Sequence, residues 1–253
     1  MPYRHVVALG SSFASGPGIP PVVDGAAGRS GANYAHLVAE GLGAELTDLT
    51  VGGATIATVL DQPQRVARKT FPPQLSGVPE GADLVTVTVG GNDLGYLATV
   101  LRLAFANRFR RRWFTRPLGN RLARGPVPVL DTDVVVEGLG TIVEAVRSRA
   151  PGARVVLVDY LTIFDEKITA EPFDDAQHRA LRALGRRVNG AFTMAAQNTG
   201  TDLIQASVLS AGHGVGTPEP WVNGFQANTG AFHPNAAGMR AIADELLLTL
   251  AVT

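Results

Sequence analysis

Residues 83–93 read Asp-Leu-Val-Thr-Val-Thr-Val-Gly-Gly-Asn-Asp. The first seven residues form a nearly continuous run of strand formers, which is typical of a strand covered on both faces. Two glycines close the run, and Asn92 and Asp93 follow them directly. In sheets covered by helices, the ligand crevice lies beyond the carboxyl ends of the parallel strands. This stretch therefore predicts a buried parallel strand and the sheet edge at which a site would lie.

Four further runs of strand length occur before and after this one. They cover 5–9 (closed by Gly10), about 45–51, 154–158 and 203–208. Segments with helical periodicity accompany them at 35–42, 134–149, 176–197 and 236–250. Because crossovers between parallel strands are right-handed, this alternation predicts an α/β fold, a three-layer α/β/α sandwich.

The composition restricts the classes of protein to which the chain can belong. The chain has 253 residues, of which 45% are apolar, 22 are basic and 22 are acidic, and it contains no cysteine. Such a chain can bury a substantial core, and it lacks the net positive charge of a general nucleic-acid binder. The absence of cysteine excludes disulfides, thiolate zinc sites and cysteine nucleophiles. We expect a single domain over residues 1–253 with no nucleic-acid partner.

The sequence also gives an expectation about location. It contains no run of about 18 apolar residues, so no membrane-spanning segment is predicted. Met1-Pro2-Tyr3-Arg4 leads directly into the first strand run, without room for a secretory signal. The numbered sequence thus predicts a cytoplasmic protein, or a secreted one only if a signal peptide was removed before the numbering began. It does not indicate an oligomeric state.

One stretch interrupts the alternation. Residues 94–130 contain eight arginines and no acidic residue, so the rest of the chain has a formal charge of −8. Apolar side chains recur at every fourth position, which predicts a helical insertion: Leu97, Leu101, Phe105, Phe109 and Trp113. Three interpretations stay open. Leu97, Leu101 and Phe105 could line a lid over an acyl pocket, the helix could be solvated and structural, or the arginines could contact an anionic membrane surface.

Small residues follow the strand runs where chemistry would be expected. Gly10-Ser11-Ser12-Phe13 can present a hydroxyl at the sheet edge, although such a turn alone is more often structural. The second run is followed by Gly52-Gly53-Ala54-Thr55, and Phe232-His233-Pro234-Asn235 precedes the last helix. Neither G-x-G-x-x-G nor a P-loop lysine accompanies the first turn, which argues against nucleotide binding. No H-E-x-x-H occurs, and no metal site is predicted.

The order of these four blocks resembles the SGNH hydrolases, the GDSL lipase/esterase family. The resemblance implies a flavodoxin-like, five-stranded parallel sheet of order 2-1-3-4-5. It also implies hydrolysis of small-molecule or lipid esters without metal or cofactor. It makes Ser12 the nucleophile and His233 the general base, and it builds the oxyanion hole from Ser12, Gly53 and Asn92. Acyltransferase or thioesterase activity on the same residues, or a non-catalytic binding protein of the same fold, remain alternatives.

Two positions depart from the family pattern. The family has an aspartate directly before the nucleophile, where this chain has Ser11, and another three residues before the histidine, where it has Gly230. A histidine base needs an acceptor at its far nitrogen to hold the reactive tautomer, and a main-chain carbonyl can serve. We therefore predict a Ser12–His233 dyad oriented by the main-chain carbonyl of Gly230.

Overall fold

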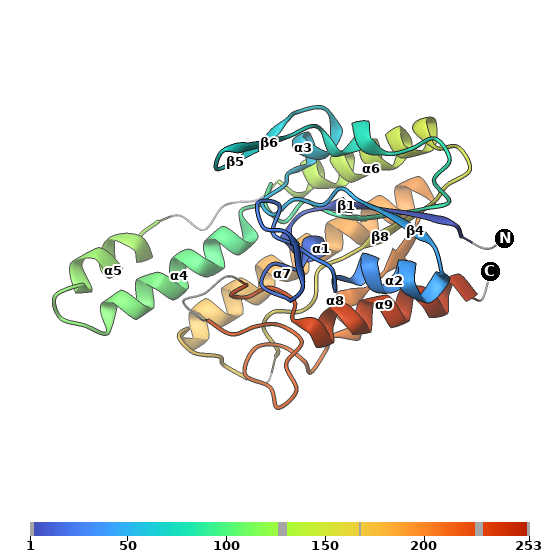
Figure 1. The fold of residues 1–253 in the computed structure, drawn as a ribbon. Helices are drawn as coiled ribbons and strands as arrows, with labels where there is room; N and C mark the ends of the chain where they lie inside the picture. Colours follow the sequence, from blue (N-terminus) through green and yellow to red (C-terminus); the bar gives the residue numbers. More distant parts are fainter. Residues whose placement is uncertain (1–2, 126–130, 167, 226–229, 252–253) are drawn as a thin grey trace.

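A five-stranded parallel sheet forms the centre of the molecule (Figure 1). The structure, a computed structural model, describes residues 3–125, 131–166, 168–225 and 230–251. Its strands are β1 (His5–Gly10), β4 (Glu45–Asp48), β7 (Leu84–Thr88), β8 (Arg154–Val158) and β9 (Asp202–Ile204), in the spatial order β4-β1-β7-β8-β9. Numbered along the chain, this is the order 2-1-3-4-5, so the predicted topology is confirmed.

Helices cover both faces of the sheet, which accounts for the apolar strands. All of β7 is buried, as are the last five residues of β1. On one face α2 (Tyr34–Leu42) packs against α9 (Ala236–Ala251), and on the other α6 (Thr132–Arg149) packs against α7 (Asp175–Thr199) (Figure 1). No helix among the described residues is long and apolar enough to cross a membrane.

Shorter elements connect the layers. The helical ones are α1 (Ser12–Ser15), α3 (Ile56–Leu60), α8 (Ala206–Leu209) and a 3₁₀ turn at Gln74–Gly77. Two small antiparallel hairpins pair β2 (Val22–Asp24) with β3 (Arg29–Ser30), and β5 (Gln64–Val66) with β6 (Lys69–Phe71). The expected fifth strand, 203–208, is wrong in its second half. There Asp159 accepts hydrogen bonds from Ser207 N and Oγ at 2.8 and 2.6 Å, and the chain turns into α8.

The arginine-rich stretch forms two helices, α4 (Tyr96–Arg110) and α5 (Arg116–Ala123), which project from the sandwich as a hairpin (Figure 1). Residues 126–130 of the predicted insertion lie outside the described residues. The predicted stripe is not the buried face of α4, because the helix packs on α5 and α7. The buried side chains are instead Tyr96, Thr99, Val100, Leu103, Ala104 and Ala106. Leu97 and Leu101 are only partly buried, and Phe105 is 39% exposed.

Candidate active site

Ser12, the predicted nucleophile, is the first residue of α1 and follows β1 after a single residue. Ser11 N donates to Thr88 O at 2.9 Å, so the turn is held against the end of the neighbouring strand β7. The Ser12 side chain is largely buried. Among the described residues, none accepts a hydrogen bond from Ser12 N and none bonds its Oγ. Both groups are therefore available to a substrate.

A buried glutamine fixes the end of β1 below this turn. Gly10 N donates to Gln74 Oε1 at 2.8 Å, and Gln74 Nε2 donates to Gly10 O at 3.0 Å. Gln74 is buried, so the pair of bonds is shielded from water. An unpartnered buried amide group costs about 1–3 kcal/mol, which the two bonds avoid. The side chain of Gln74 thus fixes the main chain two residues before Ser12.

Tyr160 joins the turn of Ser12 to the turn of Asn92. Its hydroxyl lies 3.3 Å from Ser11 Oγ and accepts a hydrogen bond from Gly91 N at 3.0 Å. Burial raises the pKa of Tyr160 to about 12, which keeps the hydroxyl neutral. A Cβ at Gly91 would lie 2.8 Å from the tyrosine ring, which explains the glycine. Ser11, which stands in place of the family's aspartate, is therefore partnered by a tyrosine.

Asn92 and Gly53, two predicted oxyanion donors, belong to adjoining turns. Asn92 Nδ2 donates to Ala54 O at 2.8 Å, and Asp93 accepts from Ile56 N at 3.1 Å. Gly53 has a φ of +80°, a left-handed conformation that favours glycine. An amide nitrogen carries two hydrogens, so Asn92 retains one for a ligand. No described residue accepts a hydrogen bond from Gly53 N.

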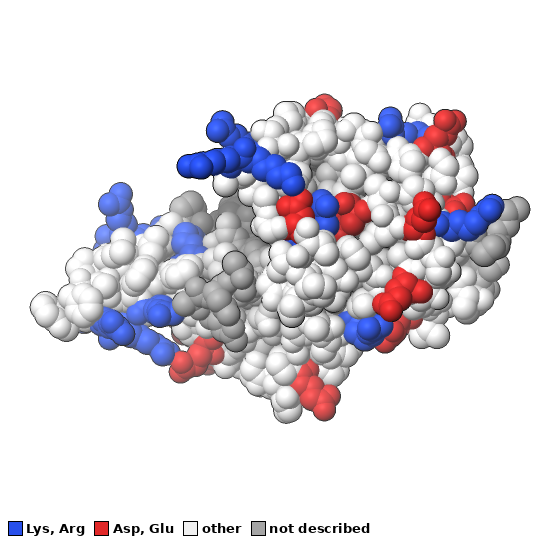
Figure 2. Space-filling view, in the orientation of Figure 1, with Lys and Arg blue, Asp and Glu red and all other residues white. Residues whose placement is uncertain are grey.

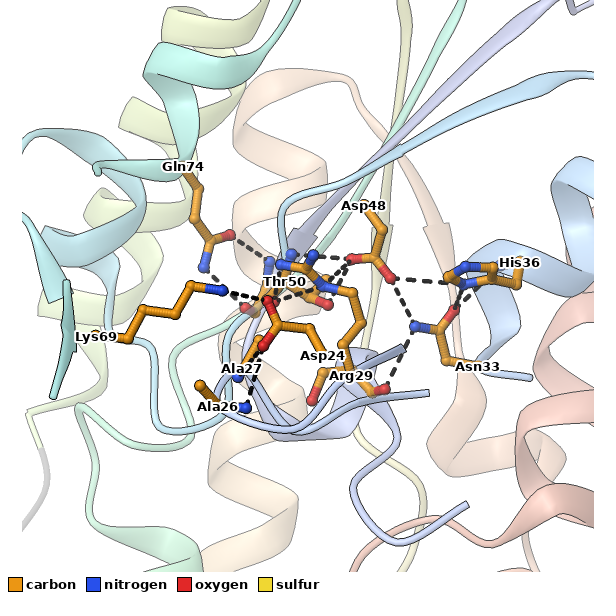
Figure 3. A network of polar contacts seen from close by, with 12 residues as sticks. Asp24, Ala26, Ala27, Arg29, Asn33, His36, Asp48, Thr50, Lys69 and Gln74 are labelled. Atoms are coloured by element: carbon orange, nitrogen blue, oxygen red, sulfur yellow. Dashed lines mark hydrogen bonds and ion pairs between the residues drawn. The ribbon is translucent and has the colours of Figure 1, made fainter. Parts of the chain in front are cut away.

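The chain leading to Gly53 is held by a network of buried and half-buried polar groups (Figure 3). Asp48, at the end of β4, accepts from Asn33 Nδ2 at 2.8 Å and from Thr50 Oγ1 at 2.6 Å. Arg29 lies 3.4 Å from the same carboxylate and donates to Thr50 O at 2.8 Å. These bonds connect the β2–β3 hairpin to the strand end. The chain that leads to the turn at Gly53 is therefore held by several side-chain contacts.

His233, the predicted base, is buried, and its ring packs on Phe13 with centroids 5.5 Å apart. Its Nδ1–H donates to Ala231 O at 2.9 Å. The predicted partner, Gly230, is wrong. The carbonyl of Gly230 accepts instead from His233 N and from Asn223 Nδ2, both at 3.1 Å.

Phe232 is the physical reason for the change of partner. Its φ of +58° is unusual for a residue with a side chain and costs about 1–3 kcal/mol of conformational energy. Complete burial of the phenyl ring offsets this cost. This backbone conformation allows the Ala231 carbonyl to meet the ring of His233, two residues later. Gly230 has a φ of +97°, and a Cβ there would lie 2.8 Å from Pro17 O. An aspartate at position 230 would therefore clash with the main chain.

The protonation of His233 follows from these surroundings. Burial lowers its pKa to about 4, and the bond to Ala231 O only partly offsets that effect. The imidazole is therefore neutral at pH 7, with Nδ1 as donor and Nε2 as a free acceptor. No described residue is bonded to Nε2.

No carboxylate bonds His233 in the described part of the chain, and the residues outside it include no aspartate or glutamate. Asp93, which follows Asn92, is bonded to Ile56 N instead. Glu219 is the acidic residue that most closely precedes His233 in the sequence, and its main-chain oxygen accepts from His213. The described residues also contain no group of three or more histidine and acidic side chains that could hold a metal ion.

Three residues of this arrangement were missed by sequence reasoning. Tyr160 lies two residues beyond β8, so the strand-end rule could have found it. Gln74 lies in a short 3₁₀ turn without any periodic signal. The carbonyl of Ala231 depends on the backbone angle of the next residue, which no side-chain pattern indicates.

Comparisons with known proteins identify relatives of this chain and similar folds. Lipase 2 of Streptomyces coelicolor is 31% identical to this chain, over 97% of this chain and 85% of the relative. The extracellular lipase of Streptomyces rimosus has a similar fold, with a TM-score of 0.76 and 24% identity, covering 98% of this chain and 99% of that one. Because that protein is described as extracellular, the expected cytoplasmic location gains no support.

Phospholipase A1 of Streptomyces albidoflavus is similar in fold as well, with a TM-score of 0.75, 20% identity and 99% coverage of both chains. The profile of the GDSL-like lipase/acylhydrolase family matches residues 8–241, which include all the turns described above. The chain therefore belongs to the GDSL-like lipase/acylhydrolase family.

Proposed function

We propose that this carboxylic ester hydrolase cleaves its substrate through an acyl-enzyme on Ser12, with His233 as the general base. One observation carries the proposal: a buried, neutral imidazole has its Nδ1 occupied by Ala231 O and its Nε2 free, beside the turn of Ser12. This is the tautomer that a serine nucleophile requires.

The reaction proceeds in two halves. Ser12 Oγ attacks the ester carbonyl while His233 Nε2 takes the hydroxyl proton. The tetrahedral intermediate collapses to the acyl-enzyme, and the imidazolium returns the proton to the leaving alcohol. Water then repeats these steps on the acyl-enzyme and releases the acid. No metal or cofactor is required.

The oxyanion is stabilised by three donors that have no acceptor among the described residues: Ser12 N–H, Gly53 N–H and the second Nδ2 hydrogen of Asn92. Each sits on an anchored turn, so little reorganisation accompanies the reaction. In comparable sites one such donor contributes about 10²–10³ in rate.

The imidazolium is supported by a carbonyl dipole in place of a carboxylate. Ala231 O holds the Nδ1 hydrogen, but its partial charge stabilises the cation less than a full negative charge would. The proposed enzyme therefore uses a dyad and relies more heavily on the oxyanion donors.

Aromatic side chains beside His233 favour an ester with an apolar acyl chain. Phe225 stacks on Phe232 with centroids 5.8 Å apart, and Phe105 of α4 meets Phe225 edge-on at 5.1 Å. Phe105 is 39% exposed, so this aromatic row extends from the histidine loop to the surface. We infer that it receives the acyl group of a lipid ester. The lid role of Leu97 and Leu101 stays a prediction.

Hydrolysis of p-nitrophenyl esters of graded chain length tests the function. We expect kcat/KM to rise from acetate to esters of medium chain length, and His233→Ala to lower kcat by about 10³ or more. A chain that hydrolyses no ester in the series would contradict the proposal and favour a binding protein of the same fold. A preference for acetate would contradict the acyl assignment alone.

We also infer that the enzyme works outside the cytoplasm, as its Streptomyces rimosus relative does. Comparing its amount in washed cells and in culture supernatant of the producing organism tests this. Confinement to the cell interior would contradict the inference.

A further inference from the structure

The α4–α5 hairpin is a closely packed unit with a fixed attachment to the sandwich. Arg102 Nη1 donates to Leu122 O at 2.6 Å, and this bond ties the two helices together. Asn107 Nδ2 donates to Pro172 O at 3.0 Å and to Gln177 Oε1 at 2.6 Å, which holds α4 against the start of α7. The hairpin therefore projects in a set direction (Figure 1).

The end of the hairpin exposes large apolar side chains. Trp113 is 85% exposed, Phe114 is 60% exposed and Leu118 is 49% exposed. The two aromatic rings contact each other edge-on, with centroids 5.9 Å apart. Contiguous apolar groups at a projecting tip mark an interaction site, and tryptophan is enriched where a membrane meets water.

Positive charge surrounds this tip. Residues 94–130 carry eight arginines and no acidic or lysine residue, whereas the rest of the chain has 14 basic and 22 acidic residues. Seven of these arginines are exposed. Arg111 pairs with Glu171, and Arg108 lies over the ring of Phe225. The other five have neither an acidic nor an aromatic partner among the described residues: Arg110, Arg112, Arg116, Arg121 and Arg124. In Figure 2 basic side chains lie along the projection, its outermost atoms are white, and acidic atoms appear only near its base.

The shape of this charge distribution favours one class of partner. A bilayer surface would contact the projecting end of the hairpin, where residues 111–125 carry five arginines and no acidic residue. The acidic side chain that reaches this end, Glu171, is paired with Arg111 at 2.7 Å and so adds little net negative charge there. A nucleic acid would extend past the tip and meet the negative body. Arginines flanking exposed tryptophan and phenylalanine match a surface of anionic headgroups above an apolar layer.

We propose that the tip of the α4–α5 hairpin, formed by Trp113, Phe114, Leu118 and the exposed Arg110, Arg112 and Arg116, binds the surface of an anionic phospholipid bilayer. This deepens the proposed function, on which it rests only for the fate of the bound lipid. The hairpin begins four residues after Asn92, and its Phe105 contacts the aromatic row that leads to His233. Docking at the tip would therefore bring lipid esters to the start of that row.

Flotation with vesicles tests the docking separately from catalysis. The Ser12→Ala chain, which cannot consume the lipid, is mixed with vesicles of phosphatidylcholine alone or with an equal share of phosphatidylglycerol. We expect binding to the anionic vesicles that is at least tenfold stronger than to the neutral ones and that weakens with salt. Absence of binding, or equal binding to both vesicles, would overturn the proposal.

Variants of the tip locate the contact. Trp113→Ala with Phe114→Ala, and Arg112→Glu with Arg116→Glu, should each weaken anionic binding at least tenfold, while Arg112→Lys with Arg116→Lys should retain most of it. Arg68→Glu with Arg240→Glu, the same double charge reversal at two exposed arginines outside the hairpin, is the matched control and should bind like its parent.

Two outcomes would overturn the assignment. One is unchanged vesicle binding in both tip variants, with melting temperatures like the parent's. The other is binding to soluble polyglutamate as tight as to anionic vesicles, which would point to an acidic protein. Hydrolysis of a water-soluble ester by the wild-type chain, without vesicles, reports on the proposed function independently. A chain that hydrolyses but does not float refutes the docking alone.

Discussion

The turn of Ser12 and the tip of the α4–α5 hairpin differ in how far their groups are in contact with the rest of the protein. At the turn, Gly10, Ser11 and Gly91 are bonded internally by buried side chains, and the free donors are those that face the proposed substrate. At the tip, tryptophan and arginine side chains are left in solvent. Groups that make no internal contact therefore indicate the function that we propose for each region: stabilising an oxyanion at the turn, and binding a lipid surface at the tip.

Of the substitutions that test this contrast, replacing an oxyanion donor should have the largest effect on the catalytic rate. Asn92→Ala removes the Nδ2 hydrogen proposed to meet the oxyanion, so we expect kcat to fall by about 10²–10³ with little change in KM. Steady-state kinetics on a soluble ester measures both constants. Hydrolysis at the wild-type rate would remove Asn92 from the oxyanion hole.

The pH dependence should reveal the buried histidine. Because the pKa of His233 is lowered to about 4, the neutral base persists well below pH 6.5, and kcat/KM should fall only as the pH approaches about 4. A rate that is already halved near pH 6.5 would contradict the burial of the base.

The same shift predicts a loss of stability in acid. The unfolded chain binds a proton at His233 near pH 6.5, whereas the folded chain does so only near pH 4, so stability falls as the pH drops between these values. The loss amounts to about 3 kcal/mol. Urea unfolding of wild type and His233→Asn at each pH isolates it. The comparison cancels Asp159, whose pKa burial raises to about 7 and whose effect on stability has the opposite sign.

Tyr160 should act through the two turns that it joins. Tyr160→Phe removes the hydroxyl that meets Ser11 and Gly91, so we expect kcat to fall about tenfold while KM changes little. Tyr34→Phe is the matched control, because it removes another buried hydroxyl, bonded to Thr88 Oγ1 at 3.0 Å. Both variants should lose about 1–2 kcal/mol of stability. Equal kcat values in the two variants would reduce Tyr160 to a structural residue.

The smallest effect is expected at the tip. Trp113→Ala removes a side chain that is 85% exposed, so the free energy of unfolding should change by less than about 0.5 kcal/mol. The other tryptophan, Trp221, stacks on His213 at 3.9 Å, and Trp221→Ala should cost about 2 kcal/mol. Urea unfolding of both variants measures the difference. A large loss in Trp113→Ala would mean that the tip serves the fold.

The fold was predictable because three of its strands, β1, β7 and β8, are nearly continuous runs of strand formers and the connections between parallel strands obey one handedness. The rule that ligands bind beyond strand ends indicated the turns after β1, β4 and β7. The resemblance to the GDSL lipase/esterase family then assigned proposed roles to Ser12, Gly53 and Asn92 within those turns. The orientation of individual main-chain groups could not be predicted from the sequence. The Ala231 carbonyl depends on the φ of Phe232, and the change from strand to helix at Ala206 depends on a side-chain contact from Asp159. The buried face of α4 is set by α5 and α7, which pack against it, and the periodicity of α4 alone does not indicate where they lie.

The central claim is that Ser12 is the activated nucleophile of a dyad, and covalent labelling tests it most directly. The native enzyme is incubated with a fluorophosphonate, and the adduct is located by intact mass and peptide mapping. We predict one adduct per chain, on Ser12, absent in Ser12→Ala and formed at least about 10³ times more slowly in His233→Ala. An adduct on Ser11 or Ser15, or no adduct while ester hydrolysis continues, would contradict it.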